Sequence, residues 1–292
     1  MMKTESRRQR TEDRWQMTAV GMILKNHKSK IISHKSERGF SLTEVLLAVG
    51  TLAVGMLFIA GVFPVSIHFT TVASERTIAA AAADEAFAKI KLYGVNLSDP
   101  DLSYNAQALY ENVSPVVVPS SEFAYPSTPI KDVRDPNYWW SAICRKVGAS
   151  DVQVTVFVSR KPGKTTNYYM RDPISMPTLI TAARPMPVIV SVSALGVATD
   201  ERMITDSMPP PADSINEASF INDGYTIVEH ADGHIYRILE RYRDDTSTPL
   251  DESRIIRLDR DWQGGGAVWV VPPPIGGGRY PCIAVYQKVM RF

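Results

Sequence analysis

Residues 38–44, Arg-Gly-Phe-Ser-Leu-Thr-Glu, and the apolar run 45–67 behind them decide the fold of this chain. A basic segment ends at a glycine, and an aromatic residue opens a long hydrophobic stretch. No Asp, Glu, Lys or Arg occurs from Val45 to Ser74. Because a helix needs about 20 apolar residues to cross a hydrocarbon core, the run predicts one transmembrane helix over about 45–67.

Charge differs on the two sides of this run. Residues 1–39 carry ten basic and four acidic side chains, net +6, and residues 40–292 carry 22 basic and 27 acidic ones, net −5. Positively charged segments stay on the cytoplasmic side of a membrane. The charges therefore predict a cytoplasmic leader at 1–39 and an extracytoplasmic remainder. They do not favour nucleic-acid binding, because Trp15 is the leader's only Phe, Tyr or Trp.

One acidic residue, Glu44, lies near the start of the apolar helix. An ionisable group at membrane depth costs about 3 kcal/mol on insertion scales and usually marks a function. A cleaved secretory signal peptide is disfavoured, since its apolar core spans only about 7–15 residues. An uncleaved single-span anchor explains the length and orientation but not the acid. A carboxylate that reaches the lipid headgroups is the remaining structural interpretation of Glu44.

The segment Gly39–Val45 resembles the processing site of type IV prepilins and type II secretion pseudopilins. That signature is a glycine before the cut, a phenylalanine or methionine after it, and a glutamate four residues further on. The run Val45–Leu57 is similar to the family's N-terminal helix. The resemblance covers a short part of the chain, but it is specific because the basic leader, junction, glutamate and apolar span must coincide.

The resemblance implies a processed membrane protein. A prepilin peptidase would cut between Gly39 and Phe40 on the cytoplasmic side and methylate the new amine of Phe40. Glu44 would pair with the Phe40 ammonium of a neighbouring subunit. The other expected partners are further pilin or pseudopilin subunits, membrane lipid, and an inner-membrane assembly platform with its ATPase. The chain would be the substrate of the peptidase, without a cofactor or enzymatic activity of its own.

The helix is expected to extend over 40–92. Pro64 removes an amide donor and, with Gly61 nearby, predicts a kink. The alanine-rich part beyond it has strong helix propensity, and Gly94 is a plausible C-terminal cap. An apolar stripe is predicted at helical spacing, formed by Ala80, Ala83, Phe87 and Ile90.

The remainder divides into a loop-rich connecting region, 93–150, and a β-rich head, 151–292. In the first, Tyr138–Trp140 is either core or an exposed contact patch, with core favoured. In the second, valines alternate with other residues over 152–158 and predict a half-buried strand. Further strands are predicted at 188–195, 225–230, 235–242, 254–258, 267–271 and 282–289. The fold class is therefore α+β, an antiparallel sheet packed on the helix.

The rest of the sequence contains residues that bear on a disulfide, a metal site, a phosphate-binding loop and a catalytic nucleophile. Cys144 and Cys282 either form a disulfide, permitted outside the cytoplasm, or are two buried free thiols. His230 and His234 flank a predicted Asp-Gly turn and are interpreted as turn residues rather than metal ligands. Gly163–Thr165 matches the end of a phosphate-binding loop but lacks its first glycine, so a basic turn is expected over Arg160–Lys164. No nucleophile motif and no metal site are predicted.

We therefore expect a minor pilin or pseudopilin in the bacterial inner membrane, single-pass, with its N-terminus cytoplasmic and its head periplasmic until filament assembly. A head of this size favours a minor subunit over a tightly repeating major one. The alternative is a single-span membrane-anchored extracytoplasmic binding module. The sequence does not separate protein secretion from adhesion, movement or DNA uptake.

Overall fold

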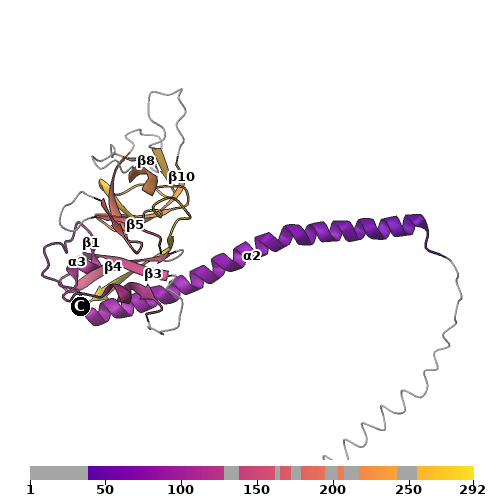
Figure 1. Cartoon of the computed structure of the whole chain (residues 1–292). Coiled ribbons are helices and arrows are strands. Elements are labelled where there is room, and N and C mark those ends of the chain that lie inside the picture. Colours follow the sequence, from indigo (N-terminus) through magenta and orange to yellow (C-terminus); the bar gives the residue numbers. More distant parts are fainter. Residues whose placement is uncertain are drawn as a thin grey trace, which may run out of the picture. The chain divides into compact units, whose positions relative to one another are not determined.

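A computed structural model describes residues 39–127, 138–161, 165–171, 179–194, 203–206, 217–241 and 255–292 (Figure 1). The chain divides into two compact units, 1–64 and 65–292, and each is described by itself. The helices are α2 (Leu42–Tyr93), α3 (Tyr110–Val113) and the 3₁₀ turns η1 (Ser120–Phe123) and η2 (Glu217–Phe220). The strands are β1 (Ala108–Leu109), β2 (Ala124–Tyr125), β3 (Tyr138–Lys146), β4 (Asp151–Arg160), β5 (Tyr168–Arg171), β6 (Leu179–Ala182), β7 (Val188–Ala194), β8 (Met203–Asp206), β9 (Thr226–Glu229), β10 (Ile235–Arg241), β11 (Ile255–Leu258), β12 (Ala267–Val270) and β13 (Cys282–Arg291).

The long helix α2 agrees with the predicted range 40–92. It runs through Pro64 without a break in its assignment, and the predicted kink at Gly61 and Pro64 stays a prediction. Gly94 ends it with a φ of +84°, and its N–H donates to the Ile90 carbonyl at 2.9 Å. Glycine adopts this left-handed conformation without steric cost, which makes it the usual residue just past a helix.

The C-terminal half of α2 buries a stripe that includes three of the four predicted residues. Ala83 and Ile90 are buried and Phe87 is half-buried, but Ala80 is exposed. The buried residues are Glu75, Ala79, Ala82, Ala83, Ala86 and Ile90. The prediction was wrong at Ala80 because a run of identical alanines leaves the phase of the helix undetermined.

The stripe packs on a five-stranded antiparallel sheet, here called the central sheet, with the order β1-β3-β4-β13 and β2 also paired to β3. The valines at 152, 154, 156 and 158 share a core with α2. Gln153, Thr155, Phe157 and Ser159 alternate with them, yet they are buried as well. The prediction of a half-buried strand was therefore wrong, since β4 is covered on both faces.

The boundary predicted at residue 151 also needs correction. Strand β3 lies in the region predicted to be loop-rich, and it pairs with β4 in register from Tyr138↔Arg160 to Lys146↔Val152. Trp140 is fully buried, and its indole N–H donates to the Glu122 carbonyl at 3.0 Å. The core interpretation of Trp140 is thus confirmed, while Tyr138 and Trp139 are half-buried.

The second face of the central sheet is covered by a closed barrel, β10-β11-β8-β7-β12-β9. Five of its strands, β7 and β9–β12, lie in ranges that were predicted as strands, and the sheet strand β13 extends two residues beyond its predicted range. The turn between β9 and β10 contains Gly233 at a φ of +77°, as its Asp-Gly sequence indicates. Closure into a barrel was not predicted. A shared core that includes Ile143, Phe157, Val228 and Trp269 joins sheet and barrel.

Both cysteines are buried free thiols. Cys144 belongs to the core between α2 and the central sheet, whereas Cys282 belongs to the core between the sheet and the barrel. A disulfide cannot bridge two faces of a sheet without a large backbone movement. Of the two alternatives, the structure therefore has the free thiols.

Candidate functional site

The junction between Gly39 and Phe40 lies just before the first turn of α2. An added Cβ at Gly39 would meet no atom within 4 Å, and the Phe40 side chain is 81% exposed. The Ser41 carbonyl accepts the first helical hydrogen bonds, from the N–H groups of Glu44 at 2.9 Å and Val45 at 3.1 Å. The peptide bond between Gly39 and Phe40 is therefore outside the helix, where a protease could bind it in an extended conformation.

Glu44 is exposed in the first turn of α2. Ser41 and Glu44 have the Ser-x-x-Glu spacing of a capping box. A negative charge near a helix N-terminus also stabilises the helix by about 0.3–1 kcal/mol through the helix dipole. Glu44 thus has a local role in stabilising the helix as well as the intermolecular role that the resemblance implies. The two roles predict different outcomes for the Glu44→Gln variant.

The apolar surface behind this junction is exposed along the helix. From Val45 to Phe69, fifteen large apolar residues are 48–76% exposed: Val45, Leu46, Leu47, Val49, Leu52, Val54, Met56, Leu57, Phe58, Ile59, Val62, Phe63, Val65, Ile67 and Phe69. The helix is long and apolar enough to span a membrane, with none of its most apolar window buried. Such a surface is stable only in an apolar environment, either lipid or other protein.

The hairpin between β9 and β10 holds the histidines that were considered as metal ligands. His230 Nδ1 accepts a hydrogen bond from Trp269 Nε1 at 3.0 Å, so this nitrogen is occupied. The described residues contain no group of three His, Cys, Asp or Glu side chains that could hold a metal ion. Burial lowers the pKa of His230, although the nearby Glu229 carboxylate opposes the shift.

Glu229 is fully buried and acts as a local anchor. Its carboxylate accepts backbone N–H groups from Ala231 at 2.8 Å, from Asp232, and from Gly265 at 2.9 Å. Burial raises the pKa of this carboxyl, but the backbone hydrogen bonds outweigh burial and lower the pKa below its ordinary value. The carboxylate therefore joins the hairpin turn to the loop before β12, which is a structural role.

An ion cluster that sequence reasoning missed fixes α2 to the rest of its unit. Glu75 lies on the buried stripe of the helix and pairs with Arg160 at the end of β4 and with Arg279 at 3.3 Å. The only sequence signal was position: Glu75 is the first Asp, Glu, Lys or Arg after the apolar run. Of the basic turn predicted at 160–164, residues 162–164 lie outside the described residues.

No protein-family model, curated protein or solved structure matches this chain.

Proposed function

We propose that this chain is a minor pilin or pseudopilin, processed at residue 39 and assembled into a filament of a type II secretion or type IV pilus system. One combination of features supports the proposal. The Gly39–Phe40 junction precedes the helix, Glu44 lies in the first helical turn, and an exposed apolar helix follows. The helix continues into a half that packs on an antiparallel sheet, which is the α+β layout expected for such a subunit.

Processing would hydrolyse the peptide bond between Gly39 and Phe40. Water adds to the Gly39 carbonyl, the leader leaves with a new carboxylate, and Phe40 keeps the amine. A sulfonium methyl donor would then transfer its methyl group to this amine, which loses a proton. A residue without Cβ allows a protease backbone to approach closely. Removing the +6 leader leaves a single positive charge, the Phe40 amine, directly before the apolar helix.

Assembly would then use this new charge. In lipid an unpaired Glu44 carboxylate is costly, and a paired ammonium offsets that cost. Phe40 and Glu44 are four residues apart in one chain, so one subunit's amine can meet the carboxylate of a neighbour displaced along the filament axis. Such a pair would select both the partner and the axial register.

Mass spectrometry of the mature N-terminus tests the proposal. We expect the chain from cells with prepilin peptidase to begin at N-methylated Phe40, and the chain from cells without the peptidase to keep its leader. A chain that starts at another residue, or that keeps its leader in both kinds of cell, would contradict the proposal.

A single-span anchored binding module is the second candidate, and one observation favours it. The barrel of β7–β12 adds a separate hydrophobic core beyond the sheet that covers α2, and a filament subunit needs no such addition. The same measurement separates the two functions, because an anchored module needs no cut at Phe40.

A further inference from the structure

Strand β13 forms an edge of the central sheet. Within the described ranges it pairs with β4 alone, from Cys282↔Ser159 to Arg291↔Asp151. The opposite edge is different, because both β1 and β2 pair with β3 there. An unpaired edge strand is a template for the addition of another strand.

Hydrogen bonds at the end of β13 fix which backbone groups face outward. The Phe292 N–H donates to the Ser150 carbonyl at 2.8 Å. In an antiparallel pair, hydrogen-bonding residues alternate with residues whose backbone groups point away from the partner. The odd-numbered residues Val285, Gln287, Val289 and Arg291 therefore direct their N–H and C=O groups outward. The Arg291 carbonyl fits this assignment, since the Lys91 amine from α2 donates to it.

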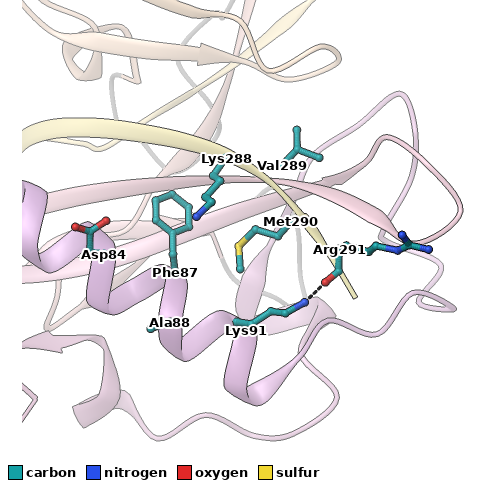
Figure 2. Close-up of a pocket in the computed structure, with 8 residues that line it drawn as sticks. All are labelled: Asp84, Phe87, Ala88, Lys91, Lys288, Val289, Met290 and Arg291. Atoms are coloured by element: carbon teal, nitrogen blue, oxygen red, sulfur yellow. Dashed lines mark hydrogen bonds between the residues drawn. The ribbon is translucent and has the colours of Figure 1, made fainter.

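A pocket of about 490 Å³ lies beside this edge, between α2 and β13. We call it the α2–β13 pocket. Figure 2 shows Phe87 and Met290 within it and Val289 turned away from the helix. The residues that line the pocket are Asp84, Phe87, Ala88 and Lys91 of α2 and Lys288, Val289, Met290 and Arg291 of β13.

The rim of the pocket carries three cations and one acid. Lys288 Nζ lies 6.0 Å from the centre of the Phe87 ring, and Lys91 Nζ lies 4.7 Å from that of Phe292. In the described part of the chain, neither Lys288 nor Arg291 takes part in an ion pair. The edge thus combines free backbone groups, an apolar floor and uncompensated positive charge.

We propose that the outer edge of β13 and the α2–β13 pocket bind an extended, acidic segment of another protein as an additional strand. Backbone hydrogen bonds to Val285–Val289 would hold the segment. Because side chains alternate along a strand, every second one would point over the pocket. An apolar side chain there would contact Phe87 and Met290. The acidic neighbours, on the other face of the added strand, would face Arg291, and Lys288 adds positive charge at the pocket rim.

Charge disfavours two occupants that the chain itself could offer, a second copy of β13 and the leader. A second copy of β13 would bring another Lys288 and Arg291 to the same edge, and like charges that face each other across strands are destabilising. The leader, with a net charge of +6, would be repelled in the same way. The site is independent of the proposed filament role, since an anchored module could use it as well.

Peptide binding to the full chain in detergent micelles tests this proposal. The probe is a fluorescein-labelled seven-residue peptide of alternating valine and glutamate, and the matched probe replaces glutamate by lysine. We expect the acidic peptide alone to raise fluorescence anisotropy. Lys288→Glu with Arg291→Glu should weaken its binding at least about tenfold and allow the basic peptide to bind.

Two further variants separate strand addition from simple charge attraction. Val289→Pro removes an outward N–H but no hydrogen bond to β4, and proline is tolerated at such edge positions. It should weaken binding of the acidic peptide at least about tenfold. Arg237→Glu, which reverses the charge of an exposed side chain on β10, should leave the affinity for this peptide unchanged. Circular dichroism checks that each variant is folded. If a variant does not fold, the Lys288→Glu single variant is measured in its place.

Three results would overturn the proposal. The first is equal binding of both peptides, or a dissociation constant for the acidic peptide weaker than about 1 mM. The second is unchanged binding in the folded Val289→Pro variant. The third is a change of self-association in Lys288→Glu, measured by sedimentation, without loss of peptide binding, which would assign the edge to a second copy of this chain.

Discussion

The Glu75 carboxylate on α2 forms an ion pair with the Arg160 guanidinium at the end of β4. The Glu75 side chain is only 10% exposed and that of Arg160 22%, so both charges are largely removed from water. Arg279 reaches the second carboxylate oxygen at 3.3 Å but is itself 56% exposed. The pair lies at the start of the buried stripe, where α2 first contacts the central sheet.

Glu75→Gln should destabilise this unit by about 2–3 kcal/mol, because it leaves a largely buried guanidinium without a counter-charge. Arg279→Gln should cost less than about 1 kcal/mol, since that arginine stays solvated. Chemical unfolding of the full chain in detergent measures both. The matched control is Glu85→Gln on the same helix, which removes an i, i+4 pair with Lys89 and should cost about 0.5 kcal/mol or less. Equal losses in Glu75→Gln and Glu85→Gln would contradict a special role for Glu75.

Much of the fold was predictable where the sequence carries a strong local signal. The apolar run and the alanines determine α2 to within two residues at each end, and Asp232-Gly233 places the β9–β10 turn. The phase of the stripe was not predictable, because Ala79 and Ala80 are chemically identical. Only the position of the sheet decides between them.

Strand β3 and the burial of both faces of β4 were missed for a physical reason. In strand β3, Trp140 packs toward α2 and Ile143 toward the barrel. Its sequence therefore lacks the regular alternation of apolar and polar residues that marks a half-buried strand. Strand β4 does alternate, but its Gln153 and Thr155 face the barrel rather than water. A pattern within one strand does not show what covers its polar face, and barrel closure depends on pairings remote in sequence.

The candidate site contains residues that the sequence indicates locally and residues that only the fold brings together. The junction and Glu44 are local signals, which need no tertiary contact to be recognised. The Glu75 cluster and the edge of β13 depend on residues more than 80 positions apart, such as Glu75 with Arg160. No spacing rule within a single segment could have found them.

The stability of the barrel should fall as the pH is lowered below about 6.5, the ordinary value for histidine. The pKa of His230 is lower in the folded protein than in the unfolded chain, so the unfolded chain binds the proton first. The stabilising contribution is complete above the unfolded pKa and is lost as the pH falls toward the folded one. Protonation would also remove the acceptor for Trp269.

His230→Asn should flatten this pH dependence, because an amide oxygen can accept the Trp269 N–H and does not titrate. Urea unfolding of the wild type and the variant at pH 7 and pH 5.5 measures the difference. Glu229 does not interfere in this range. Its lowered pKa gives a contribution that is complete above about 4.5 and lost only at more acidic pH. A variant as pH-sensitive as the wild type would exclude His230 as the titrating group.

Gly264→Ala should destabilise the loop over Glu229 by about 1–3 kcal/mol through overpacking. An added Cβ would collide with Glu229 Cγ and lie 2.7 Å from Trp262 Cζ2. Gly266→Ala is the control two residues away, where the nearest atom, the Val192 carbonyl oxygen, would be at 3.8 Å. Thermal unfolding of the two variants compares them. If Gly266→Ala proved as costly as Gly264→Ala, a backbone conformation of this loop that alanine does not tolerate, rather than the collision with Glu229, would explain the effect.

Glu44→Gln separates the two roles of Glu44. Glutamine also satisfies a capping box, so the helix should form and the protein should insert into the membrane as before. It cannot form an ion pair with a neighbour's Phe40 amine, and incorporation into filaments should fall at least about tenfold, as for a charge pair in low dielectric. Glu44→Ala should show the same assembly defect.

Filament incorporation of these variants is measured in sheared filament fractions, and membrane insertion in the corresponding membrane fractions. Glu85→Gln, on the C-terminal half of α2, should assemble normally. If Glu44→Gln assembles normally while Glu44→Ala does not, capping of α2 explains the glutamate and the intersubunit pair does not exist. If both assemble, Glu44 has neither role. Only a defect in both variants, with membrane insertion intact, supports the pairing of Glu44 with Phe40, because the charge is the one property that both substitutions remove.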